Sequence, residues 1–378
     1  MSGGSHLFIT GMPRSGTTLL DKLLSMPGYS RVYSQPLPLL FSEIKRSYLD
    51  RLGRTAEYPL NDMLLSNYYD PQDWLHFLMQ FQIDAAYFER VATAMRSFSG
   101  QYTRRDDVTD FVQSHRALTT DRFIVSYLSW LDDSNHKLTG LKETWCEEYL
   151  PFLVGSGFKC LLILRDPRDI ITSLNYGRGR GYGGRIKPLL YNVRTWRKSV
   201  AFSLQLGGNT NFMVIRYEDL VSDPEPVMAR VFEFLSLPAA QPECLTGAIT
   251  DQQGLPWKSN SSHGERDSIS ADSVGKYTEY LSPQIVKLVE ALCLPEMALL
   301  GYHHELSASQ VEQALSNVRN SEALERPELA GYLWSNDRCE EEKQRIELLL
   351  AGEYRPRYFL FQRAFRQLGN ALQRLRLT

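Results

Sequence analysis

A loop suited to binding phosphate follows the first apolar run of the chain, and its sequence is Gly11-Met12-Pro13-Arg14-Ser15-Gly16-Thr17-Thr18. The run His6–Thr10 before it predicts a buried strand, and the pattern after it predicts a helix from Thr17. Unpaired N–H groups at a helix start attract anions, and glycine lets the backbone approach them closely.

The two glycines match the pattern Gly-x-x-x-x-Gly-Lys-Ser/Thr, but Thr17 stands at the lysine position. Arg14 can supply the missing charge, so we expect a phosphate other than the β- and γ-phosphates of ATP. The alternative is an ordinary turn.

A second polar cluster follows the apolar run Lys159–Leu164, and its sequence is Arg165-Asp166-Pro167-Arg168-Asp169 with Ser173 after it. Arg165 stands at the carboxyl end of a predicted parallel strand, where ligands of open α/β sheets bind. Ser173 is placed to reach the same anion as Arg165 if that anion lies over the helix start. The two aspartates suit the N-cap and N3 positions of this helix, so we interpret both as structural caps.

The two motifs together resemble the family of sulfotransferases that use 3′-phosphoadenosine-5′-phosphosulfate (PAPS), and the resemblance covers roughly residues 6–304. It implies that Arg165 and Ser173 hold the 3′-phosphate, the group that distinguishes PAPS from ATP. It also implies that the 5′-phosphosulfate is held by Arg14, Ser15, Gly16, Thr17 and Thr18.

Three weaker matches are similar to tyrosylprotein and related sulfotransferases. The resemblance implies that Tyr217 lies near the adenine and that Lys276 closes on the cofactor. It also implies that Ser261 and Ser262 belong to a Ser/Asn-rich lid strand. The alternative for Tyr217 is a core tyrosine at a strand end.

The chemistry implied is an in-line attack of an acceptor hydroxyl on sulfur, which releases 3′,5′-ADP. The protein mainly positions the partners and stabilises charge on the leaving phosphate, with Arg14 and the loop N–H groups facing that charge. We expect no metal, since there is no triphosphate to neutralise. The histidines show no metal-ligand spacing either.

A base must take the hydroxyl proton, and several residues are candidates. Gln35 stands where tyrosylprotein sulfotransferases have a glutamate, so that match fails. Glu43 resembles the glutamate base of heparan-type sulfotransferases, but a solvated carboxylate on a helix face is an equal alternative. Glu143 and His115 are further candidates, and a structural role is favoured for the histidine. Lys142 resembles a lysine that polarises the transferring group.

The elements that must position these residues predict an α/β fold with a central parallel sheet flanked by helices. Strand-like runs at 6–10, 159–164 and 212–216 are each followed by a turn and a helical pattern. Residues of about 60–135 predict a helical insertion within a domain over 1–305, and 306–378 predict a helical C-terminal extension.

The end of the extension is rich in arginine and contains an apolar stripe, which consists of Phe361, Ala364, Phe365, Leu368, Leu372 and Leu375. Such a stripe packs on its own domain or on a homodimer mate, and this is preferred over contact with an acidic partner or a membrane surface. The basic, glycine-rich stretch 177–187 is either a mobile gate near the cofactor or a solvated loop.

Composition limits the class of protein. The 378 residues carry a net charge of -2, which excludes a global attraction to nucleic acid. Five scattered cysteines without a CxxC pair fit a reducing compartment. The absence of a signal peptide or a membrane span leads us to expect a soluble, cytoplasmic protein acting on a small metabolite or a saccharide.

Two other function classes stay open. A P-loop kinase or NTPase is disfavoured by Thr17 in the lysine position and by the Arg165–Ser173 pair. A non-catalytic nucleotide-binding module is suggested by Gln35 and by the C-terminal extension.

Overall fold

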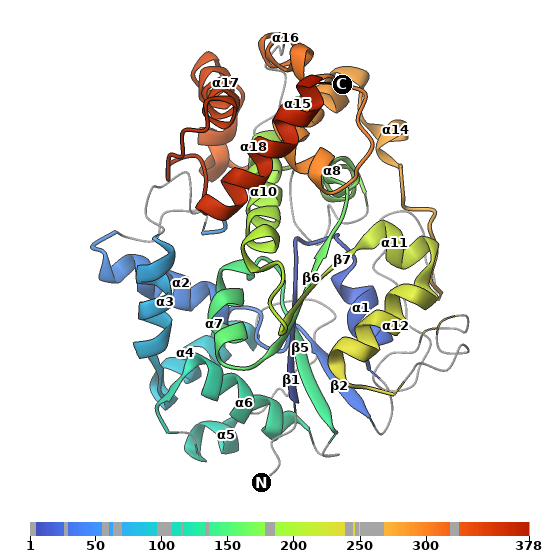
Figure 1. Ribbon diagram of the computed structural model, residues 1–378. Coiled ribbons are helices and arrows are strands. Elements are labelled where there is room, and N and C mark those ends of the chain that lie inside the picture. Colours follow the sequence, from blue (N-terminus) through green and yellow to red (C-terminus); the bar gives the residue numbers. More distant parts are fainter. Residues whose placement is uncertain are drawn as a thin grey trace.

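The chain forms a five-stranded parallel sheet with β1 at its centre (Figure 1). The computed structural model describes residues 5–25, 29–54, 60–62, 70–96, 108–114, 116–132, 136–177, 186–238, 245, 249, 268–317 and 325–377. The strand order is β2-β5-β1-β6-β7, and the strands are β1 (Ser5–Thr10), β2 (Ser30–Ser34), β5 (Leu138–Lys142), β6 (Lys159–Leu164) and β7 (Phe212–Arg216). The central strand therefore pairs directly with β6, so both polar motifs leave the same edge of the sheet side by side.

Helices follow most strands. Before β7 they are α1 (Thr17–Leu23), α2 (Leu40–Arg51), α3 (Pro71–Gln80), α4 (Ala85–Arg96), α5 (Thr109–Ser114), α6 (Thr120–Leu131), α7 (Leu150–Gly155), α8 (Pro167–Asn175) and α10 (Leu189–Leu206). After β7 they are α11 (Tyr217–Ser222), α12 (Pro224–Leu235), α14 (Tyr277–Tyr280), α15 (Pro283–Leu299), α16 (Val311–Ser316), α17 (Asn336–Ala351) and α18 (Gln362–Leu377). A short antiparallel pair, β3 (Gln82–Ile83) and β4 (Leu118–Thr119), lies among α3 to α6.

The sheet is buried on both faces, because alternate side chains of its strands enter two different clusters. Leu7 and Ile9 of β1 pack with residues of α1, α11 and α12. Phe8, between them, packs on the opposite face with residues of α2, α7 and α10. Figure 1 shows these two helix groups on either side of the strands. Such two-sided burial explains why the strands are nearly continuous apolar runs.

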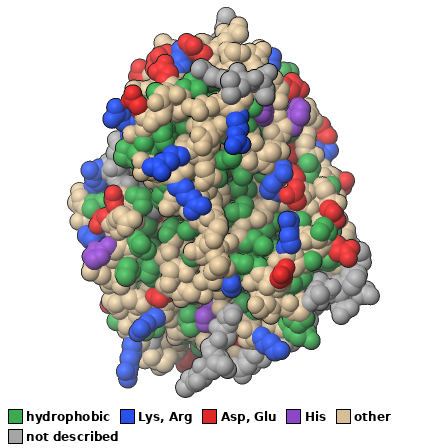
Figure 2. All heavy atoms as spheres, viewed as in Figure 1, with side chains coloured by type: hydrophobic (Ala, Val, Ile, Leu, Met, Phe, Trp, Pro, Cys, Tyr) green, Lys and Arg blue, Asp and Glu red, His purple; other side chains and the backbone are tan. Residues whose placement is uncertain are grey.

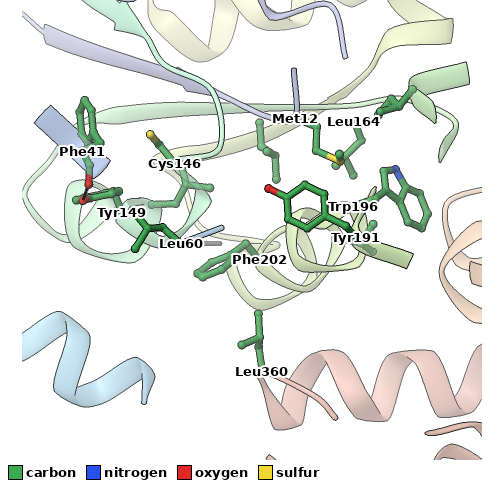
Figure 3. Packing of buried hydrophobic residues seen from close by; sticks show 14 of the residues in the cluster. Met12, Phe41, Leu60, Cys146, Tyr149, Leu164, Tyr191, Trp196, Phe202 and Leu360 are labelled. Carbon is green, nitrogen blue, oxygen red and sulfur yellow. Dashed lines mark hydrogen bonds between the residues drawn. The ribbon is translucent and has the colours of Figure 1, made fainter. Parts of the chain in front are cut away.

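Helix α10 packs beneath the first polar loop. Met12 of that loop lies in one apolar cluster with Leu164, Tyr191 and Trp196, as Figure 3 shows. The Trp196 indole N–H also donates to the carbonyl oxygen of Arg165 at 2.8 Å. One helix therefore fixes the ends of both β1 and β6.

The C-terminal helices pack on the rest of the chain. The Phe361 ring meets Phe202 of α10 edge-on, with ring centroids 4.9 Å apart, and α18 also contacts α15 and α17. The predicted stripe is buried, except for Leu375, which is partly buried. Of the two partners expected for the stripe, the structure shows its own chain, and the homodimer stays a prediction. Figure 2 shows Lys and Arg side chains over the part of the surface where α18 lies. Three arginines of α18 are exposed: Arg363, Arg366 and Arg374.

The fold class is as predicted, but two strands were missed. The three predicted strands are β1, β6 and β7, and the helical pattern predicted after each of them is confirmed by α1, α8 and α11 with α12. The missed β2 and β5 contain polar residues and a glycine. Gly140 of β5 is needed because an added Cβ would lie 2.8 Å from the Cβ of Leu7 on β1. Among the described residues, no helix is long and apolar enough to span a membrane.

Candidate active site

The first polar loop turns sharply before α1. Arg14 adopts a φ of 72° and Gly16 a φ of 100°. A non-glycine residue in this region costs about 1–3 kcal/mol and persists only where its surroundings hold it. The Ser15 hydroxyl donates to the Met12 carbonyl at 2.7 Å and stabilises the turn. Gly16 is the N-cap of α1 and has no side chain to bond the first N–H groups of that helix.

The two polar motifs meet at Arg14. Its Nε donates to the Ser173 hydroxyl at 2.9 Å. Arg165 donates from Nη1 to the Arg14 carbonyl at 3.0 Å. Residues that lie more than 150 positions apart in the sequence thus form one cluster of two guanidinium groups and a hydroxyl.

Arg165 is buried, and its charge is only partly compensated. Its guanidinium carbon lies 4.5 Å from the centre of the Tyr217 ring, and Nη2 donates to the Ser273 carbonyl. Among the described residues, the nearest carboxylate oxygen is on Asp169, 3.8 Å away. Nε has no partner among the described residues. A buried cation with an unused donor suits an anionic ligand, since charge-assisted hydrogen bonds are the strong ones.

Tyr217 also leaves no room for a side chain at position 16 of the loop. A Cβ added to Gly16 would lie 2.5 Å from a Tyr217 ring carbon. Only glycine suits this position, because of the φ angle and because of the Tyr217 ring. Glycine also carries no side chain that would cover its own backbone.

Of the two aspartates predicted to cap α8, only Asp166 does so. The Asp166 side chain accepts from the Arg168 N–H at 2.9 Å, which confirms Asp166 as the N-cap. The N–H of Asp166 itself is bound by Glu218 of α11 at 2.8 Å. The predicted partner, Asp169, does not make this bond. Burial raises the pKa of Glu218 to about 7.

Asp169 holds a different segment. It accepts from the N–H of Gly275 at 2.8 Å and from the N–H of Tyr277 at 3.0 Å. Its interpretation as a cap of its own helix is therefore wrong, because a partner distant in sequence replaces the local one. Through these bonds α8 fixes the backbone on both sides of Lys276.

A buried lysine lies at the end of β5, next to α1. The Lys142 ammonium is 3.3 Å from the Thr18 hydroxyl, 3.4 Å from the Gln35 side-chain oxygen and 3.6 Å from an Asp21 carboxylate oxygen. Burial lowers the pKa of Lys142, while the nearby Asp21 and Glu143 act to raise it. Gln35, which stands where a base was sought, is thus a partner of this lysine.

Glu143 follows this lysine and is also buried. It accepts the N–H of Leu37 at 2.9 Å, and burial raises the pKa of Glu143 to about 8. Two positions after Glu143, the backbone N–H of Trp145 donates to the Gly11 carbonyl at 3.1 Å. The segment that follows β5 therefore lies along the start of the loop. Glu43 is different: its side chain is 40% exposed and forms an ion pair with Arg46 at 3.1 Å on the surface of α2.

Comparison with known proteins shows the family of the chain. A family model described as "Sulfotransferase family" matches residues 6–242, more than half of the chain. The chain belongs to the sulfotransferase family. Mouse and human carbohydrate sulfotransferase 2 are 30% identical to it over 107 residues, which is 27% of this chain and 19% of those proteins. The chain thus matches about a fifth of the length of these curated relatives.

Two solved structures are similar to this sulfotransferase in fold. The sulfotransferase domain from the curacin biosynthetic pathway is 17% identical, with a TM-score of 0.44 over 79% of this chain and 98% of that domain. A mouse sulfotransferase complexed with PAP is 12% identical, with a TM-score of 0.42 over 78% of this chain and 84% of that one.

The other predicted site residues of this sulfotransferase either make a different bond or lie outside the described residues. The Lys276 ammonium is bonded to Glu279 at 2.6 Å, and its side chain is partly exposed. Ser261, Ser262 and His115 lie outside the described residues, as do residues 178–185 of the glycine-rich stretch. Among the described residues, no group of three or more His, Cys, Asp or Glu side chains could hold a metal ion.

Three residues near the cluster were missed by the sequence reasoning. The carbonyl of Ser273 accepts a hydrogen bond from Arg165, and the indole N–H of Trp196 donates one to the Arg165 carbonyl. Asp21 lies beside Lys142. Each makes a contact across the fold, and no local pattern marks such a residue.

Proposed function

We propose that this sulfotransferase transfers the sulfuryl group of PAPS to a hydroxyl of a small metabolite or saccharide and releases 3′,5′-ADP. The observation that carries the proposal is the meeting of Arg14, Ser173 and Arg165 at one edge of the sheet. Two separate phosphate-binding motifs in one cluster suit a nucleotide with phosphates on both the 5′ and the 3′ position.

The residues present fit such a ligand. The N-cap of α1, Gly16, makes no side-chain hydrogen bond to the first N–H groups of that helix, and the buried Arg165 has an Nε donor without a partner among the described residues. We assign the 5′-phosphosulfate to Arg14 and the Ser15–Thr18 backbone, and the 3′-phosphate to Arg165 and Ser173. Tyr217 would border the adenine, and Lys276 with Ser261 and Ser262 would cover the nucleotide.

In the proposed transfer, the acceptor oxygen forms a bond to sulfur while the bond from sulfur to the bridging phosphate oxygen breaks. Arg14 and the loop N–H groups stabilise the negative charge that stays on the leaving phosphate. The Lys142 ammonium faces the transferring group from the Thr18 side. Because these donors meet the developing charge, the proposed step is independent of a metal.

We assign the proton of the acceptor hydroxyl to Glu143 and keep Glu43 as the rival base. Glu143 is buried, lies beside Lys142 in the sequence and belongs to the segment that borders the loop. A buried carboxylate with a raised pKa is the better base once ionised, since proton affinity and basicity rise together.

A cytoplasmic location is also part of the proposal. Cys146, Cys160, Cys293 and Cys339 are free and buried, which suits a reducing compartment.

The test is transfer from radiolabelled PAPS to a panel of hydroxylated metabolites and saccharides, with 3′,5′-ADP release measured in the same reaction. The proposal predicts labelled acceptor and 3′,5′-ADP in equal amounts. Binding of 3′,5′-ADP without transfer to any acceptor would favour a non-catalytic module. Phosphoryl transfer from ATP would favour a kinase.

A further inference from the structure

A cavity of about 310 Å³ lies among α10, α15, α17, α18 and the segment before α18. Its walls carry five arginines, which are Arg194, Arg197, Arg338, Arg345 and Arg357. None of the residues assigned to the sulfuryl-transfer site lines it. Helix α10 separates the two: Thr195 and Trp196 contact Met12 and Arg165, and Arg194 and Arg197 line the cavity.

The carboxylates in the walls do not balance these arginines. Arg194 is paired with Asp62 at 2.5 Å, and Arg197 makes two bonds to Glu342, at 2.6 and 2.8 Å. These two arginines are therefore compensated one for one.

The remaining arginines are less well compensated. Glu341 is shared, since it binds both Arg338 and, at 2.7 Å, Arg357. One carboxylate thus serves two guanidinium groups, which leaves one positive charge in excess at this end of the cavity.

Arg345 supplies an independent sign of a ligand. It is 5% exposed, and its Nη2 is bonded to Glu296. Its Nη1 is buried and has no hydrogen-bond partner among the described residues. Burial lowers the pKa of Arg345, which means that the ion pair does not fully compensate for the lost solvation. A buried donor without a partner calls for an explanation, and a bound ligand or water is one; an oxygen of Glu296 is also without a partner among the described residues.

We propose that this cavity binds a small organic anion, whose carboxylate or phosphate group is held by Arg345 with Arg338 and Arg357. The rest of the wall suits an apolar body, because Phe359, Leu360 and Leu368 also line the cavity. The volume fits a small molecule, at the lower end of the range of ligand sites. The bound anion would contact α10 on the side opposite to the one that fixes Arg165.

The experiment is calorimetric titration of the full chain with benzoate and with phenyl phosphate, in the presence of excess 3′,5′-ADP to fill the nucleotide site. Benzyl alcohol serves as the uncharged analogue. The proposal predicts saturable one-site binding of at least one anion and none of benzyl alcohol. Absence of saturable binding by both anions overturns it.

Two variants locate the binding. Arg357→Gln removes an arginine whose side chain is 59% exposed. The variant should fold and should bind the anion about three- to tenfold more weakly. Arg355→Gln is the matched control: it is 63% exposed, two positions away and outside the cavity wall, and should change nothing. Equal affinity in Arg357→Gln and in the unaltered chain overturns the proposal.

A double variant tests Arg345 itself. Arg345→Gln combined with Glu296→Gln removes the buried pair together, so that no charge is left unpaired. Provided that the variant keeps a cooperative thermal transition, anion binding should fall by more than about tenfold. Full-strength binding in this folded variant would contradict the assignment, and if the variant does not fold, the Arg357→Gln result decides.

Discussion

At the scale of single residues, Arg165 and Ser173 are the residues proposed to recognise a 3′-phosphate. Ser173→Ala and Arg165→Ala should each weaken 3′,5′-ADP binding, the arginine variant by about 1.5–3 kcal/mol, while binding of 5′-AMP hardly changes. Titration calorimetry of both ligands measures the difference. Equal losses for the two nucleotides would mean that these residues hold the fold of the loop and not a 3′-phosphate.

The base can be identified by turnover. Glu143→Gln should lower turnover by roughly 10²-fold or more and keep nucleotide affinity, because a glutamine oxygen can still accept the Leu37 N–H. Glu43→Gln is the matched control on the exposed face of α2 and should leave turnover within about twofold. The opposite pattern would assign the base to Glu43.

The pH profile gives a second, independent readout of the same residue. Burial raises the pKa of Glu143 to about 8, and a base acts only when ionised. Turnover at saturating substrates should therefore rise with pH through about 8. A profile that is already flat from pH 6 upward would contradict Glu143 as the base.

At the scale of elements, the turn into α1 is the feature most sensitive to substitution. Gly16→Ala would bring a Cβ to 2.5 Å from the Tyr217 ring at a φ of 100°, so either the loop or the tyrosine must move. We expect loss of 3′,5′-ADP binding by more than about tenfold.

Gly53→Ala is the control for that turn. Gly53 also has a positive φ, of 68°, but nothing lies within 4 Å of an added Cβ. Its substitution should cost about 1 kcal/mol of stability and leave nucleotide binding unchanged. Equal effects of the two variants on binding would show that contact with Tyr217 is irrelevant.

Local features of the sequence predicted some of these elements and missed others. The strand–loop–helix units at β1 and β6 were predictable, because a short apolar run, a turn and a cap are local features. The N-cap role of Asp166 was predictable for the same reason. Asp169 was misinterpreted, because its N3 position suggested a local bond, whereas its partners are the N–H groups of Gly275 and Tyr277. Strand β5 was missed because Gly140, required by close packing on Leu7, interrupts its apolar pattern.

At the scale of the whole molecule, the C-terminal helices are part of the same packed structure as the sheet. Phe365 of α18 is 4% exposed and packs edge-on against Tyr354 and Phe359. Phe365→Ala should lower the free energy of unfolding by about 3–5 kcal/mol, because it leaves a cavity among buried rings. Denaturant unfolding followed by tryptophan fluorescence measures this loss.

The neighbouring position supplies the control. Arg366 is exposed on the same helix, and Arg366→Ala should change the free energy of unfolding by less than about 0.5 kcal/mol. If Phe365→Ala is equally mild, α18 contributes little to the fold, and its packing on α10 and α15 is not energetically important.

The central claim is that the two polar motifs form one site for a nucleotide with a 3′-phosphate. The most direct test is calorimetric titration of the unaltered chain with 3′,5′-ADP and, separately, with ADP. The account predicts that 3′,5′-ADP binds about ten- to a hundredfold more tightly, because only this nucleotide can use the buried Arg165 donor and the Ser173 hydroxyl. Equal or tighter binding of ADP would contradict the account and assign the loop to an ordinary nucleotide.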